Sequence, residues 1–105
     1  MKNNQEQIQS DSVILAQDVV RYGGMQLFYS LKVKTGKPVN VFEIAVSKED
    51  ESSTAEAGST LDFAWFTYRS VVENIVTPCT LEDVMRDFEY SHRKLQKNLY
   101  KRAFL

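Results

Sequence analysis

The sequence predicts an α+β protein, a three-stranded antiparallel β-meander followed by two α-helices, the C-terminal one long. Three observations predict this class. Residues 25–34 alternate apolar and polar side chains, the period of a half-buried strand. Turn candidates, Gly23-Gly24 and Thr35-Gly36, stand on either side of that run. After residue 60, apolar residues recur at helical spacing.

The three strands can be tested against one another by assuming that both turns are two residues long. The first turn then places Val20 opposite Leu27, Ala16 opposite Leu31 and Ile14 opposite Val33. The second places Tyr29 opposite Phe42, Leu27 opposite Ile44 and Met25 opposite Val46. Both registers gather apolar residues on one face, and a slip of one residue would turn the wrong face inward. The agreement indicates an antiparallel meander.

Asp18 is the one misfit on the apolar face, opposite Tyr29, where it marks a bulge or an edge position. The other face of the sheet is not fully polar either. It would carry five apolar residues: Leu15, Val19, Phe28, Val39 and Val41. Two interpretations of this face stay open. It is partly covered by a loop or by the N-terminal segment, or it is a subunit interface.

Residues 47–60 are acidic and rich in Ser, Thr, Ala and Gly, with no apolar residue larger than Ala. This composition predicts a mobile acidic loop. The polar residues 1–12 predict a flexible N-terminal segment, which leaves residues 13–105 as a single α+β domain.

The first predicted helix spans residues 61–76, with an apolar face formed by Leu61, Trp65, Tyr68, Val72 and Ile75. The aromatic and β-branched content leaves open whether residues 61–68 are helix or strand. Thr77-Pro78 is expected to end the helix, because a residue before proline disfavours helical backbone angles.

The second predicted helix runs from Leu81 to about Tyr100. Thr80 is the expected N-cap, with Asp83 in the capping-box position, and Cys79 is expected to be a small buried hydrophobe beside it. Acidic residues occupy the first turns and basic residues the last, as the helix dipole favours.

The composition narrows the class of protein. The net charge is −1, there is one cysteine, and no apolar run has the length of a membrane span. The polar start has no apolar core of a signal peptide, so a cytoplasmic location and a protein without membrane contact are expected.

No residues stand out as catalytic, metal-binding or cofactor-binding, and the chain is not expected to be an enzyme. Cys79 and His92 lie on one predicted helix, roughly 18 Å apart by helical rise, too far for a nucleophile and its base. One Cys and one His cannot form a structural zinc site. An enzyme that uses Cys79, or acidic residues joined only by folding, is the least favoured alternative.

The basic end of the last helix is the best candidate site, as a partner-binding surface. It contains five cations and two aromatic residues: Arg93, Lys94, Lys97, Lys101, Arg102, Tyr100 and Phe104. We therefore expect a small non-enzymatic protein-interaction or regulatory protein, which acts through this helix or through the free sheet face. Its expected partner is another protein or further copies of the same chain, for example in a homodimer. The alternative is nucleic-acid binding through the same cations.

The sequence also resembles an uncharacterised family of short bacterial proteins of unknown function. The resemblance lies in Phe28–Val33, in Phe42–Ser47 and in Thr77-Pro78 leading into Thr80–Phe88, about half of the chain. The acidic stretch and the basic terminal extension depart from the family pattern. Since that family has no assigned activity, the resemblance implies only a fold outline.

Overall fold

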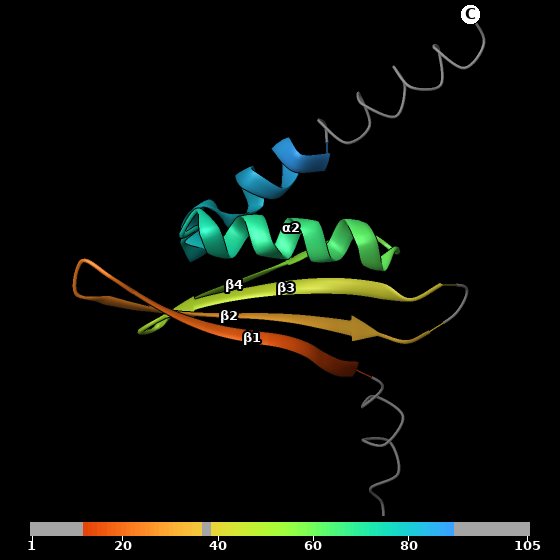
Figure 1. Cartoon of the computed structure of the whole chain (residues 1–105), viewed down its shortest axis with the longest axis horizontal. Helices are drawn as coiled ribbons and strands as arrows, with labels where there is room; N and C mark the ends of the chain where they lie inside the picture. The colour runs from red at the N-terminus through yellow and green to blue at the C-terminus, as the bar shows by residue number, and fades with distance from the viewer. Residues whose placement is uncertain (1–11, 37–38, 90–105) are drawn as a thin grey trace, which may run out of the picture.

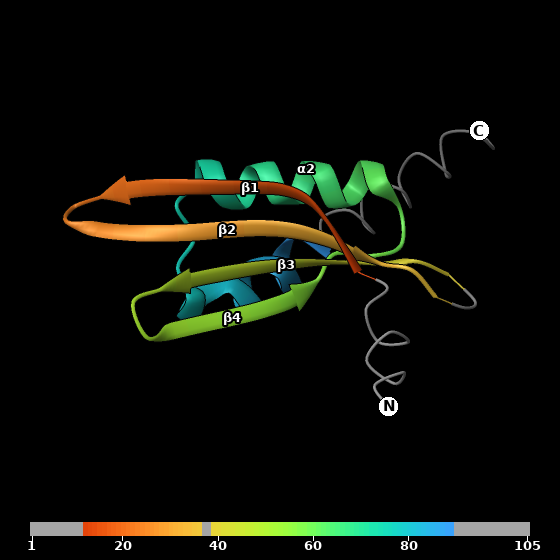
Figure 2. The same cartoon turned by 90° about the horizontal axis from the view of Figure 1, so that it is seen from below.

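A computed structural model describes residues 12–36 and 39–89 as two layers, a sheet and a helical layer (Figure 1). The sheet contains β1 (Ser12–Tyr22), β2 (Met25–Lys34), β3 (Val41–Lys48) and β4 (Glu51–Glu56). These four antiparallel strands lie in the order β1-β2-β3-β4 (Figure 2). The helix α2 (Leu61–Glu73) and a following helical segment cover one face of the sheet. The α+β class is therefore confirmed.

The β1–β2 hairpin turns at two glycines, as the sequence predicts. Gly23 and Gly24 have φ angles of 57° and 82°, which are the positive values that a two-residue hairpin turn requires. The register pairs Val20 with Leu27 and Ala16 with Leu31. Both predicted pairs are thus confirmed, and the hairpin is fixed by its turn.

The β2–β3 register differs from the prediction. Tyr29 pairs with Val46 and not with Phe42, because the connection between the strands spans residues 35–40 and not two residues. The displacement is even, so every side chain keeps its predicted face, since strand side chains alternate with a period of two. The wrong turn length therefore left the buried face correctly predicted.

The predicted acidic loop at residues 47–60 is wrong in its central part, and so is the count of three strands. Residues 51–56 form β4, which pairs antiparallel with β3 through a two-residue turn at Glu49-Asp50. Glu49 adopts a φ of 52° in that turn. The strand lacks a strong signal because its inward residues, Ser53 and Ala55, are small, and its edge position lets the other side chains stay polar.

The core lies between the inner face of the sheet and the helices. It is built mainly from the alternate residues of β2 and β3 that the sequence pattern selects, together with side chains from the helical layer. The buried hydrophobic residues are Leu27, Tyr29, Leu31, Phe42, Ile44, Val46, Ala57, Ala64, Tyr68, Val71, Val76, Leu81 and Met85. Tyr29 is satisfied in this core because its hydroxyl donates a 2.9 Å hydrogen bond to the Val76 carbonyl oxygen.

Residues 61–68, for which helix and strand were both open, form the first turns of α2. The helix ends at Glu73, before the predicted end at Val76. The chain leaves it through a Schellman motif, in which the Val76 N–H bonds the Val71 carbonyl and the Ile75 N–H bonds the Val72 carbonyl. Ile75 occupies the left-handed position with a φ of 53°, where glycine is usual. Because isoleucine and not glycine stands at this position, the sequence contains no signal for the end of α2.

The last helical segment begins with a 3₁₀ turn, Pro78–Thr80, and continues as α-helix through residues 81–89. Together they form a short helix of 12 residues, so the predicted length is not confirmed, and the predicted extension to Tyr100 lies outside the described residues. Thr80 is not an N-cap, because its hydroxyl donates back to the Thr77 carbonyl oxygen at 3.2 Å. Of the predicted flexible segment 1–12, Ser12 begins β1 and the rest lies outside the described residues.

Candidate functional site

Exposed apolar side chains concentrate on β1, which is an edge strand of 11 residues. Isolated exposed hydrophobics are normal, but a contiguous group indicates an interaction surface. Those that β1 carries are Val13, Ile14, Leu15, Val19 and Tyr22, with exposed fractions between 42% and 58%. Ile14 and Val19 lie on the outer face of the sheet, away from the helices, where Phe28 on β2 stands directly opposite Val19. Val13 and Tyr22 lie on the helical side, because their partners on β2 share the face of Leu27.

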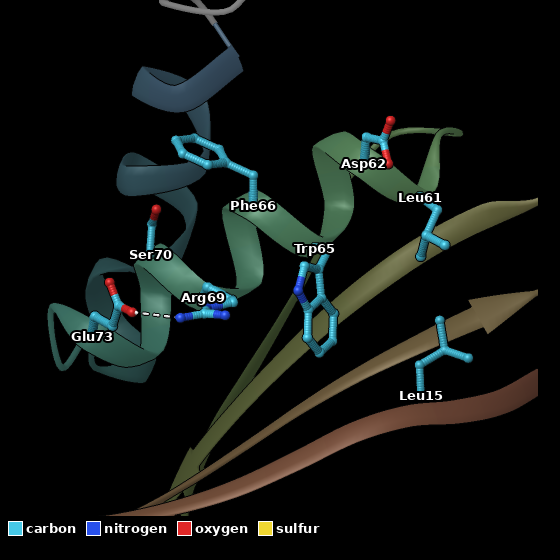
Figure 3. Close-up of a pocket in the computed structure, with 8 residues that line it drawn as sticks. All are labelled: Leu15, Leu61, Asp62, Trp65, Phe66, Arg69, Ser70 and Glu73. Carbon is cyan, nitrogen blue, oxygen red and sulfur yellow. Dashed lines mark hydrogen bonds and ion pairs between the residues drawn. The ribbon is translucent and has the colours of Figure 1, made fainter.

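A β-bulge at Leu15 turns one of these side chains toward α2. The register shifts between Ile14 and Ala16, so Ile14 pairs with Lys32 and Val13 pairs with Val33. The predicted pair of Ile14 and Val33 is therefore wrong, and Leu15 does not belong to the outer face where the alternation had placed it. Its side chain rises from β1 on the helical side of the sheet (Figure 3). Bulges commonly re-aim a side chain in this way.

Leu15 forms one wall of an open groove of about 720 Å³ between β1 and α2. We call this the β1–α2 groove; its lining residues are Leu15, Leu61, Asp62, Trp65, Phe66, Arg69, Ser70 and Glu73. Trp65 and Leu61 point from α2 toward Leu15, whereas Phe66 projects from α2 away from the sheet (Figure 3). The groove is therefore apolar where the strand and helix face each other.

Charged residues stand at the rim of the groove. Arg69 and Glu73 form an ion pair of 3.3 Å one helical turn apart on α2. Both side chains are more than half exposed, so the pair contributes little to stability, about 0.3–0.5 kcal/mol. An apolar centre with a polar rim is the arrangement found in protein–protein interfaces.

Tyr68 joins α2 to β1 beside this groove. Its hydroxyl donates a 2.6 Å hydrogen bond to the Asp18 carboxylate, which explains how the acidic misfit of β1 is accommodated. Burial raises the pKa of Tyr68 strongly, and the hydrogen bond and negative charge of Asp18 raise it further. Burial also raises the pKa of Tyr29. Both phenols therefore stay protonated and serve as hydrogen-bond donors in the fold.

The structure does not place the partner-binding residues predicted from the sequence relative to this groove. Arg93, Lys94, Lys97, Tyr100, Lys101, Arg102 and Phe104 all lie outside the described residues, as does His92. Cys79 is exposed on the 3₁₀ turn, so its expected burial is wrong. Its neighbour Pro78 is the buried residue of that turn.

Residues 12–36 and 39–89 contain neither a metal-binding cluster nor a membrane-spanning helix. Within them, no group of His, Cys, Asp or Glu could hold a metal ion. In the same ranges no helix has both the length and the apolar character needed to cross a membrane.

The sequence prediction missed the groove because it assigned the wrong face of α2 to the core. The predicted face was Leu61, Trp65, Tyr68, Val72 and Ile75, whereas the buried residues are Ala64, Thr67, Tyr68 and Val71. Small residues let the helix approach the sheet closely, which leaves Leu61 and Trp65 about half exposed at its side. One sequence signal could have indicated the groove. Aromatic residues occur all around α2, and a single sheet can cover only one face of a helix.

Comparisons with known proteins give no relative for this chain: no family model, no curated protein and no solved structure matches it. The resemblance to a family of short bacterial proteins thus stays an expectation.

Proposed function

We propose that this chain is a small protein-interaction or regulatory protein without an enzymatic activity of its own. Its partner-binding surface is the exposed edge strand β1 together with the β1–α2 groove. The observation that carries the proposal is the clustering of exposed apolar residues there, Leu15, Leu61 and Trp65 in the groove, together with the exposed Val19 on the outer face of β1. Burying such residues against a partner releases about 25 cal/mol per Å² of apolar surface.

The shape of the surface favours a macromolecular partner over a small molecule. Small-molecule sites enclose most of the ligand and carry convergent polar groups. The β1–α2 groove is open, its polar residues form a rim, and it runs beside a free strand edge that can add a strand from another chain.

The test is a pull-down from native host lysate with the tagged full chain, run with and without nuclease, and with a groove variant. Trp65→Glu places a charge in the groove at an exposed position, so the fold is expected to persist. The matched control is Val39→Glu, which charges an exposed apolar residue outside β1 and α2. The proposal expects a stoichiometric protein that survives nuclease, is retained by Val39→Glu and is lost with Trp65→Glu.

Two results would count against the proposal. Partners that Trp65→Glu retains would place the binding surface elsewhere. Partners that disappear with nuclease would favour nucleic-acid binding through the basic residues near the C-terminus, where affinity should also fall steeply with salt.

A further inference from the structure

The backbone groups at the outer edge of β1 can be identified from the turn. The two-residue turn makes Tyr22 and Met25 a hydrogen-bonded pair, and such pairs alternate along an antiparallel ladder. The N–H and C=O groups of Gln17, Val19 and Arg21 therefore point away from β2. Residues 16–22 follow the bulge and are regularly paired with β2, and no other strand within residues 12–36 and 39–89 pairs with their outer edge.

We propose that a second copy of this chain covers that edge, with the two β1 strands antiparallel about a twofold axis at Val19. This inference rests on the proposed function and names its partner. Val19 then forms a reciprocal hydrogen-bonded pair with Val19 of the second copy, and Gln17 pairs with Arg21 of the second copy. The two sheets become one continuous sheet of eight strands, a size that open sheets reach.

The choice of Val19 as the centre follows from the bulge and from charge. Centring the pair on Gln17 would require the bulged residue Leu15 in the ladder, where regular pairing is broken. Centring it on Asp18 would place two carboxylates directly opposite each other, which is destabilising. About Val19, the paired segments lie wholly within residues 16–22, and no like charges face one another.

This arrangement also brings a side chain of the second copy to the β1–α2 groove. Tyr22 of the second copy pairs with Ala16, and Tyr22 lies on the helical side of the sheet because its partner Met25 shares the face of Leu27. Opposed residues in such pairs have Cβ atoms about 4.5–5.5 Å apart, so the phenol ring reaches past the small Ala16 toward Leu15 and Trp65. Tyr22 is 58% exposed in the single chain, at the hairpin end that extends beyond α2 (Figure 1).

The contrast between the two sheet edges supports a partner strand at β1 only. The other edge strand, β4, has 6 residues and carries Glu51 and Glu56 at its ends, features that protect edges from pairing. β1 is longer, with 11 residues, and the charged side chains of its segment 16–22 are Asp18 and Arg21, which are of opposite sign. Asp18 is held by Tyr68, so it does not block the edge. A symmetric dimer needs a self-complementary patch, which an antiparallel strand edge provides.

A cysteine at the proposed centre tests the pairing directly. In a Cys79→Ser background, Val19→Cys places two thiols on paired residues whose Cα atoms are about 5.5 Å apart, within disulfide range. Phe28→Cys is the matched control, because Phe28 pairs with Val19 and is exposed like it. The two copies of Phe28 would be about 14 Å apart, three strand spacings, which is too far for a disulfide.

A proline at the same position tests the backbone contacts. The Val19 N–H faces away from β2, so Val19→Pro removes no hydrogen bond within the chain, and edge strands tolerate such a proline. It is expected to weaken self-association at least tenfold, measured by sedimentation equilibrium. Circular dichroism should show that the single chain keeps its fold.

The inference predicts a dimeric full chain and a disulfide dimer with Val19→Cys but none with Phe28→Cys. It also predicts at least tenfold weaker self-association with Val19→Pro. A monomeric full chain at high micromolar concentration would overturn it, and so would a dimer whose Val19→Cys variant does not cross-link. Either failure leaves the proposed function standing if a lysate protein is still captured through Trp65. Failure of that capture with a confirmed dimer would restrict the function to self-association.

Discussion

The Tyr68 hydroxyl and the Asp18 carboxylate form a 2.6 Å hydrogen bond that ties the middle of α2 to the edge strand β1. β1 contributes little to the core, since Ala16 and Val20 are its partly buried residues packed there. This bond therefore links α2 directly to β1, which is otherwise held by its pairing with β2. Its loss should loosen the surface that we propose for partner binding.

Tyr68→Phe is expected to lower the free energy of unfolding by about 1 kcal/mol. A hydrogen bond to a charged group contributes about 1.5–3 kcal/mol, and the exposure of Asp18 reduces this. Urea denaturation of the full chain measures the change. Asp18→Asn is the control, since its amide oxygen still accepts from Tyr68 and a smaller loss is expected. Equal stability of Tyr68→Phe and wild type would show that the bond does not hold β1.

Alkaline pH should destabilise the fold through Tyr68 and Tyr29. The pKa values of both phenols are raised above the ordinary 10.0 by burial, and Asp18 adds to the shift at Tyr68. The unfolded chain then loses these protons at lower pH than the folded chain does. Their stabilising contribution is full below pH 10.0 and is lost as pH rises through the folded pKa values.

This pH dependence can be measured as urea midpoints between neutral and strongly alkaline pH. Tyr68→Phe should show a shallower fall above the ordinary tyrosine pKa than wild type does, because one of the two protons is gone. A fall of equal steepness in both proteins would contradict the assignment to Tyr68.

Thr67→Val should raise the free energy of unfolding by about 1 kcal/mol. Thr67 is fully buried on α2, and its hydroxyl has no hydrogen-bond partner among the described residues. A buried polar group left unpaired costs about 1–3 kcal/mol, and valine keeps the shape without that group. Thr67→Ser, which keeps the hydroxyl and removes the methyl group, should lower the stability instead. A destabilised Thr67→Val would mean that the hydroxyl is satisfied.

Gly58→Ala should destabilise the protein by about 2 kcal/mol, for two reasons. Gly58 has a φ of 79°, which disfavours any residue with a Cβ, and a Cβ there would lie 3.2 Å from the Phe63 ring, so the ring would have to shift. Gly24→Ala separates the two effects, since Gly24 has a φ of 82° and open space around it. If both variants lost the same stability in thermal denaturation, the contact with Phe63 would be unimportant.

The sequence predicted best where a period and a turn agree. The alternation in β2 selected Leu27, Tyr29 and Leu31 for the core, and all are buried. The Gly-Gly turn then set the register with β1. Even a connection of the wrong length between β2 and β3 preserved the faces, because only an odd slip exchanges them.

The predictions failed where the sequence pattern is weak, as in β4, or where it fits two different faces of one element, as in α2. β4 has small side chains and no apolar alternation, so it was predicted as a loop. The helix α2 is apolar on more than one face, so spacing alone could not distinguish Ala64 and Val71 from Leu61 and Trp65. The bulge at Leu15 has no glycine to mark it. The β1–α2 groove was not predicted, because it depends both on the bulge at Leu15 and on which face of α2 is buried.

Amide hydrogen exchange along β1, followed by NMR at increasing protein concentration, tests most directly whether β1 is a binding edge. The amides of Val20 and Tyr22 face β2 and should be protected throughout, which provides an internal reference. If a second copy pairs with β1, the amides of Gln17, Val19 and Arg21 become protected as concentration rises. If these three amides exchange freely at every concentration while Val20 and Tyr22 stay protected, β1 remains an open edge and the pairing that we propose does not occur.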